Sequence, residues 1–269
     1  MKIQNYSFHT HTDFSDGNEP LDNMLKKAVE LGWQEIGITD HLTINQSLKN
    51  SLVFFDVSCA YYSFKEAKPI FQKYIEDSRN CAKKYPLDVK IGFEVDYFLD
   101  NGWKEELIDF LKDMDTDYLI SGNHYAFYND RPFPVQMLAK CAPLESHESI
   151  IKNHLRAINE AISSRLFNMI AHIDFFRRNK GILLDDYKPE IEEILNSLAK
   201  TNTATEISTK GLRKAGDFYP SEPILRGIKD RNIPIIISDD AHRTEELGKD
   251  FDKAEACLNE LGITNRWHP

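Results

Sequence analysis

The chain lacks any long apolar run. Nowhere in its 269 residues does an apolar stretch approach the roughly 18 residues needed to span a bilayer, which excludes a membrane-spanning protein. Residues 1–6 also lack the apolar segment and the small-residue cleavage site of a secretory signal. We therefore expect a cytoplasmic protein whose mature chain begins here, with no membrane partner.

Cysteine is scarce and positive charge is in deficit. The four cysteines never occur as Cys-x-x-Cys, which argues against a thiolate zinc site and against a disulfide framework. The 33 basic residues face 43 acidic ones, and the net charge of −10 disfavours attraction to nucleic acid or to an anionic membrane. We expect a small-molecule substrate and no nucleic-acid partner; the oligomeric state stays open. We expect reduced, mostly buried thiols at Cys59, Cys81, Cys141 and Cys257.

Short β-rich runs alternate with longer segments of helical apolar spacing, such as residues 20–31, 146–164 and 189–199. This alternation predicts a parallel α/β sheet, and about seven strand–helix units favour closure into a distorted (β/α)7 TIM-like barrel. No linker-like stretch interrupts residues 1–269, so we expect a single domain. A doubly wound open sheet is the structural alternative. The predicted strands are 3–8, 35–39, 89–95, 117–121, 168–173, 203–207 and 233–237.

One segment, at about residues 44–62, has many polar and aromatic residues and no clear period, so we expect a long loop over one end of the barrel. Its aromatic side chains are candidates for a lid, and packing over the barrel would explain them equally well. These side chains are Phe54, Phe55, Tyr61 and Tyr62.

Imidazoles and carboxylates gather where the predicted strands end. In a (β/α) barrel these ends share one face, where catalytic residues concentrate, so side chains more than 200 positions apart should meet there. Each cluster alone has an ordinary explanation as a turn, a helix cap or a solvated loop. Six of the nine histidines nevertheless follow strands, and we assign no role to His147, His154 and His268. The clusters contain His9 and His11, Asp40 and His41, Glu94 and Asp96, His124, His172 and Asp174, and Asp239, Asp240 and His242.

Imidazole and carboxylate without thiolate form the ligand set of zinc, manganese and iron. His9 and His11 should point the same way, because side chains alternate along a strand with a period of two. With so many candidate ligands one ion is too few, and a carboxylate such as Glu94 can bridge two ions. We therefore expect a cluster of two or three divalent ions.

The ordered set of these motifs resembles the polymerase and histidinol phosphatase (PHP) superfamily over nearly the whole chain. The residues that carry this resemblance are "HTH" at 9–11, Asp16, "TDH" ending at His41, Glu94, His124, His172 and "SDDAH" at 238–242. "EISTKGLRK" at 206–214, Tyr219-Pro220, and His172-Ile173-Asp174 followed by Arg177-Arg178 resemble its histidinol-phosphate phosphatase branch.

This resemblance implies a distorted seven-stranded barrel with three divalent ions, zinc, manganese or iron, at the strand ends. Many relatives have histidine in place of Asp16, so the third site has a harder ligand here, which favours manganese or iron. Asp13 is left as a turn residue. By resemblance the first ion is held by His9, His11, Glu94 and Asp239, the second by Glu94, His124 and His172, and the third by Asp16, His41 and His242.

The resemblance also implies hydrolysis of a phosphate monoester, L-histidinol phosphate, to L-histidinol and phosphate. A water between two ions would lose a proton near neutral pH and attack phosphorus in line. Arg178 and Arg213 are candidates for a phosphate clamp, since guanidinium groups bind phosphate oxygens in a fork. Asp240 or Asp174 could orient the ligands or assist the leaving alkoxide.

Two other functions remain open. One is a PHP-type phosphodiesterase or 3′-exonuclease, against which the negative charge and the lack of a basic, aromatic-rich patch argue. The other is a non-catalytic metal-binding scaffold, which would be expected to have lost some ligands, whereas the set here has no gap.

Overall fold

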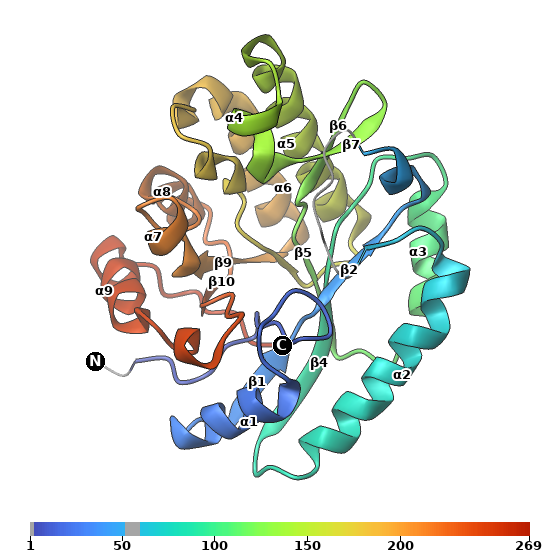
Figure 1. The fold of residues 1–269 in the computed structure, drawn as a ribbon. Helices are drawn as coiled ribbons and strands as arrows, with labels where there is room; N and C mark the ends of the chain where they lie inside the picture. The colour runs from blue at the N-terminus through green and yellow to red at the C-terminus, as the bar shows by residue number, and fades with distance from the viewer. Residues whose placement is uncertain (1–2, 52–59) are drawn as a thin grey trace.

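The computed structural model describes residues 3–51 and 60–269 and has the α/β architecture that the alternation predicts (Figure 1). The strands are β1 Glu35–Ile38, β2 His41–Ile44, β3 Ala60–Tyr61, β4 Asp88–Val95, β5 Tyr118–Ser121, β6 Tyr125–Tyr128, β7 Arg131–Pro134, β8 Met169–Ile170, β9 Ala204–Ser208 and β10 Ile235–Ser238. The α-helices are α1 Leu21–Glu30, α2 Phe64–Ala82, α3 Trp103–Leu111, α4 Leu138–Cys141, α5 His147–Ser164, α6 Lys188–Thr201, α7 Lys210–Lys214, α8 Glu222–Asp230 and α9 Phe251–Leu261.

The main sheet is parallel, with the strand order β10-β9-β8-β5-β4-β2-β3, and β1 also pairs with β4. Ile38 lies opposite Ile91 and His41 lies opposite Glu94, so β1 and β2 keep one register along β4 and form one strand edge interrupted between them. This register places His41 directly across from Glu94 at the carboxyl end of the sheet.

The N-terminal segment lies between the two edges of the sheet. On one side, Gly37 N donates to Ser7 O at 2.8 Å and Thr39 N donates to Thr10 O at 2.8 Å. On the other side, His11 N donates to Ala241 O at 2.8 Å, just beyond β10. The segment thus joins β1 to the end of β10 by scattered hydrogen bonds, although it does not form the regular strand predicted at residues 3–8. These bonds occupy the edges that a doubly wound open sheet would leave free.

Two apolar clusters support this frame. The larger lies between the sheet and the helices, where α5 and α6 bury the predicted stripes, including Ile158 and Leu195. A smaller cluster consists mainly of strand residues on the other face of the sheet, among them Ile120, Met169 and Ile236. Each fully buried side chain of this size contributes about 1.5–3 kcal/mol to folding. The helices lie around the sheet (Figure 1).

A hairpin that the sequence reading missed follows β5. Strands β6 and β7 pair antiparallel, with Asn129 and Asp130 between them at φ 51° and 57°. This left-handed pair is the two-residue turn that suits the twist of a hairpin, and Asn and Asp tolerate it better than most residues. Ser51 Oγ donates to Pro132 O at 2.9 Å, so the hairpin contacts the chain after β2.

The expected long loop contains ordered pieces. Residues 46–50 form a 3-10 helix, and β3 pairs with β2. Tyr61 packs against Phe71 with ring centroids 5.3 Å apart, whereas Tyr62 is exposed. Phe54 and Phe55 lie outside the described residues.

Of the described cysteines, Cys141 is exposed and Cys81 and Cys257 are half-buried, so the prediction of mostly buried thiols was wrong for them; all three are free. They lie on or beside helices, where the apolar stripe is made by other residues. None of the helices in residues 3–51 and 60–269 combines the length and the apolar character needed to cross a membrane.

Candidate metal centre

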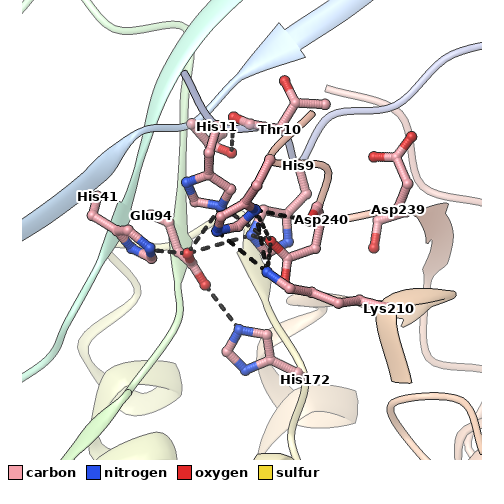
Figure 2. Close-up of polar contacts among 12 residues, drawn as sticks. His9, Thr10, His11, His41, Glu94, His172, Lys210, Asp239 and Asp240 are labelled. Atoms are coloured by element: carbon pink, nitrogen blue, oxygen red, sulfur yellow. Dashed lines mark hydrogen bonds and ion pairs between the residues drawn. The ribbon is translucent and has the colours of Figure 1, made fainter. Parts of the chain in front are cut away.

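Glu94, near the end of β4, lies at the middle of a group of histidines (Figure 2). It is 1% exposed. A Cβ atom at position 122 would lie 2.3 Å from Glu94 Oε1, so only glycine fits beside the Glu94 side chain at this position. Five imidazoles surround its two oxygens: from Oε2, His9 Nε2 at 3.4 Å, His11 Nε2 at 3.4 Å and His41 Nδ1 at 3.1 Å, and from Oε1, His172 Nε2 at 2.9 Å and His124 Nε2 at 3.7 Å.

The donor atoms form overlapping groups of a size that suits single ions. Within each group the candidate ligand atoms lie within 4.8 Å of one another. Glu94 occurs in two groups and His11 in two, so the groups share residues as a multinuclear centre requires. The four groups are His11, Asp16, His41 and His242; His9, His11 and Asp240; His9, Glu94 and His172; and His41, Glu94 and His124.

Several of these atoms are buried without a hydrogen bond. Among the described residues, the atoms without a hydrogen bond include Nε2 of His9 and both ring nitrogens of His11. Burying unpaired polar atoms is costly, and buried polar atoms of this kind are usually paired or bound to metal. Imidazole nitrogens and carboxylate oxygens are ligands of zinc, manganese and iron, so the residues present fit divalent metal ions.

The electrostatics of the centre keep its carboxylates ionised. Burial raises the pKa of Glu94, but His9, His124 and His41 outweigh it and hold this pKa well below its usual range. Burial likewise opposes ionisation of Asp240, and Lys210 and His9 hold its pKa well below the ordinary value. Both carboxylates therefore carry the negative charge that cation binding needs.

Glu206, in the middle of β9, fixes the orientation of His9. Its Oε2 accepts from His9 Nδ1 at 2.8 Å and from Ser238 Oγ at 2.6 Å, and its Oε1 accepts from His172 N at 3.0 Å. With Nδ1 donating to Glu206, the lone pair of His9 is on Nε2, which faces Glu94 and Asp240. Sequence reasoning quoted Glu206 within a motif but gave it no role; the signal was a carboxylate in the middle of a buried strand.

Two further carboxylates support neighbouring ligands. Asp96 Oδ1 accepts from His124 N at 2.6 Å and from His124 Nδ1 at 3.1 Å. Asp40 accepts from Thr12 N at 2.7 Å and from Ser15 Oγ at 2.5 Å, which holds the loop that carries Asp16. The loop thereby keeps Asp16 within reach of the histidines.

Asp16 itself lies between two imidazoles. Its Oδ1 is 3.2 Å from His41 Nε2 and 3.1 Å from His242 Nε2. Burial opposes its ionisation, but His41 and His242 hold the pKa of Asp16 far below its usual range. Asp13, three residues earlier, is exposed and belongs to none of the donor groups.

The structure corrects the choice between the two aspartates after β10. Asp240 Oδ1 lies 3.2 Å from His11 Nε2 and 3.7 Å from His9 Nε2. Asp239 Oδ1 accepts from Ser7 Oγ at 2.8 Å and its Oδ2 from Gly248 N at 2.7 Å, outside the donor groups. In Figure 2 Asp239 stands apart, away from Glu94 and the histidines. The expected first-ion set with Asp239 is therefore wrong in its fourth member.

The reason is the alternation of side chains along β10. Ile236 belongs to the apolar cluster on the inner face of the sheet, and Ser238 bonds to Glu206 on that same face. Asp239 follows the outward row of Ile237, whereas Asp240 lies beyond the end of β10 with φ 47° and faces His9 and His11.

A pocket beside the donor groups brings some of the other predicted residues together. Arg178 lines it, as predicted for a phosphate-binding residue, and so does Lys210, which sequence reasoning had left without a role. Lys210 Nζ is 3.0 Å from Asp240 Oδ1 and 3.2 Å from His242 Nδ1. The lining residues are Asp16, His41, Asp96, His124, Tyr125, Gln136, Phe175, Arg178, Lys210, Asp240 and His242.

The other two predicted residues do not line this pocket. Arg213 Nη2 donates to Asp239 O at 3.4 Å, and its Nε is 3.9 Å from Glu246. Asp174 Oδ2 accepts from Arg177 Nε at 2.6 Å and from Ser221 N at 2.9 Å, so that carboxylate oxygen braces the loop after β8. Asp174 therefore does not line the pocket, and its part in ligand orientation or leaving-group chemistry stays a prediction.

The chain is similar to known proteins. The family model described as the PHP domain matches residues 7–210. The chain belongs to the PHP domain family. Over 273 aligned residues, this PHP domain is 23% identical to the histidinol-phosphatase of Bacillus subtilis (strain 168), covering 91% of this chain and 96% of the relative.

Solved structures share the fold. The histidinol phosphate phosphatase of Lactococcus lactis, complexed with zinc, L-histidinol and phosphate, has a TM-score of 0.70 and 22% identity, covering 96% of this PHP domain and 94% of that chain. A proposed histidinol phosphatase of Listeria monocytogenes has a TM-score of 0.73 and 20% identity, covering 92% and 99%. The distorted TIM-like α/β fold predicted for this PHP domain is confirmed.

Proposed function

We propose that this PHP domain is a metal-dependent phosphate monoesterase that hydrolyses L-histidinol phosphate to L-histidinol and inorganic phosphate. The observation that carries the proposal is the position of Glu94 among five imidazoles, with Lys210 and Arg178 at the adjoining pocket. The Bacillus subtilis relative is named a histidinol-phosphatase, and the Lactococcus lactis structure contains zinc, L-histidinol and phosphate. Both support this substrate.

Three divalent ions, of zinc, manganese or iron, would occupy the overlapping donor groups. When bound, such ions polarise phosphoryl oxygens and lower the pKa of water, which supplies the nucleophile for hydrolysis. The group of His11, Asp16, His41 and His242, which would hold the third ion, combines a carboxylate with three imidazoles, a harder set that suits manganese or iron. Asp240 replaces Asp239 in the group with His9 and His11.

The chain's own residues would divide the remaining work. Glu206 holds His9 with the imidazole Nε2 toward the centre. His9 therefore needs no reorientation when a metal ion binds. Lys210 and Arg178 provide cationic donors on the pocket wall, where they can bind phosphate oxygens as charge develops on them. Asp240 stays ionised, which suits a ligand and excludes it as the acid that protonates the leaving alkoxide.

The test compares three substrates under identical metal loading. We expect Mn²⁺- or Zn²⁺-reconstituted protein to hydrolyse L-histidinol phosphate faster than bis(p-nitrophenyl) phosphate and faster than a short single-stranded DNA. Faster cleavage of the diester or the DNA would overturn the proposal in favour of the phosphodiesterase. Metal-loaded, folded protein without activity on any monoester would favour the non-catalytic scaffold.

A matched pair of variants makes the assay specific for the centre. Glu94→Gln keeps the shape of the side chain but removes its charge, and should abolish hydrolysis and lower bound metal. Asp13→Asn makes the same chemical change at an exposed carboxylate of the loop that carries Asp16, and should leave both unchanged. An equal loss of hydrolysis and of bound metal in the two variants would show that the loss does not come from the metal centre.

A further inference from the structure

Gln136 is a pocket residue to which neither the family motifs nor the metal groups give a role. It lies in the 3-10 helix Val135–Met137, directly after the β6–β7 hairpin, and it lines the pocket beside His124 and Phe175. Its Oε1 is buried and forms no hydrogen bond with the part of the chain that the structure describes. Leaving a buried amide oxygen unpaired is costly, so its presence at a pocket wall calls for a ligand.

The other acceptors of the pocket are already engaged. Asp96 is bonded to His124, Asp16 lies between two imidazoles, and Asp240 is paired with Lys210. These carboxylates belong to the metal centre or support its ligands. Gln136 differs from them because its amide oxygen has no hydrogen bond within the described part of the chain and the side chain carries no charge that would repel a phosphate.

The backbone around Gln136 is held on both sides. Val135 N donates to His124 O at 2.9 Å, which closes the hairpin onto the candidate ligand. Asn179 Nδ2 donates to Val135 O at 2.8 Å, and Asn179 Oδ1 accepts from Ala139 N at 3.0 Å. Asn179 directly follows Arg178, so the same segment fixes both the amide and a candidate phosphate-binding cation. Such a frame presents a fixed polar group to a ligand.

An apolar wall adjoins the amide. The ring of Phe175 lies 4.8 Å from that of His172 and 5.1 Å from that of His124, and the guanidinium of Arg178 lies 5.9 Å from its centroid. Phe175 thus separates the candidate ligands from Arg178 on one side of the pocket. Gln136, Phe175 and Arg178 all line the same pocket, so a ligand in it has an amide, an aromatic ring and a guanidinium around it.

Resting on the proposed function, we infer that Gln136 is the residue that recognises the alcohol half of the substrate, accepting a hydrogen bond from its N–H groups. The substrate class is then a phosphate monoester whose leaving alcohol carries an ammonium or imidazole N–H. A site built to pair such a donor discriminates against an ester that lacks it, because its acceptor then stays buried and unpaired.

The experiment compares Gln136→Met, which has similar length but no acceptor, with Met137→Leu in the same turn, which does not line the pocket. We expect Gln136→Met to lower kcat/KM for L-histidinol phosphate by about 10- to 100-fold. For p-nitrophenyl phosphate, which has no N–H donor, we expect a change of less than about threefold. Met137→Leu should behave as wild type with both substrates.

Product inhibition provides a second test of the role of Gln136. Inhibition by L-histidinol should weaken in Gln136→Met in the same proportion as kcat/KM, while inhibition by inorganic phosphate and the bound metal stay unchanged. Equal losses for both substrates, or no loss for either, would overturn the role of Gln136 and leave the proposed function standing. Wild-type protein that hydrolyses p-nitrophenyl phosphate but not L-histidinol phosphate would overturn both.

Discussion

The two consecutive aspartates after β10 allow a sharp test of the metal centre. Asp239→Asn and Asp240→Asn are the same chemical change at adjacent positions, both buried. Only Asp240 lies in a donor group with His9 and His11. If the substitutions act by disturbing the end of the strand, both variants should lose metal and activity alike. If they act by removing a metal ligand, only Asp240→Asn should lose them.

The expected magnitudes follow from the surroundings of each carboxylate. Replacing a residue that merely supports a ligand typically costs 10- to 100-fold in metal affinity or activity, so loss of the Asp240 ligand should exceed about 100-fold. Burial raises the pKa of Asp239 to about 7, so a neutral side chain is nearly what that site already favours. An asparagine there can still accept from Gly248 N and should cost no more than about 1 kcal/mol in stability and less than about tenfold in activity.

The assay measures bound metal per chain by plasma emission spectrometry after dialysis, and kcat/KM for L-histidinol phosphate. Urea unfolding of both variants serves as the control for folding. Metal loss in Asp240→Asn with near-normal metal in Asp239→Asn is the expected result. The reverse pattern, with Asp239→Asn losing the metal and Asp240→Asn keeping it, would refute the geometric argument.

Two further predictions concern buried residues behind the centre. Glu206→Gln should weaken metal binding and kcat/KM by about 10- to 100-fold because His9 loses its charged partner; an unchanged metal titration would contradict this. Burial, followed by the charges of His172 and His124, lowers the pKa of His154 to about 3. The unfolded chain therefore takes up the proton first as the pH falls below about 6.5, and wild type loses about 2 kcal/mol of stability between pH 8 and pH 5 through this group. His154→Leu should lack this loss, so its stability relative to wild type, from urea unfolding in chelator, should rise by about 2 kcal/mol over that interval; an equal difference at both pH values would count against the mechanism.

Local patterns in the sequence predict much of the fold. Six of the seven predicted runs are strands in the described chain, and the apolar stripes of α5 and α6 face the core as their spacing indicates. The exception is the run at 3–8, which bonds to β1 through Ser7 O and to β10 through the Gln4 side chain without forming a regular ladder. Its pairing depends on segments far away in the chain, so its local composition could not reveal the irregularity.

The β6–β7 hairpin shows a different limit. Its Asn129-Asp130 turn is a recognisable signal, but the flanking strands are only four residues long and lie between the predicted strand at 117–121 and the predicted helical segment at 146–164. A prediction based on repeated strand–helix units therefore missed the hairpin. The hairpin leads directly into Gln136, so the residue that we assign to substrate recognition was missed with it.

By itself the sequence determined which residue types meet at one face. Parallel strands share a direction, so His9, Glu94, His124 and His172 had to gather at the carboxyl ends once the alternation was recognised. The tertiary structure decided which of two adjacent side chains faces inward and which groups are free to bind. That Asp240 rather than Asp239 lies among the histidines, and that Lys210 rather than Arg213 lines the pocket, depends on the backbone beyond β10 and on the hydrogen bonds of distant loops, which no local pattern encodes.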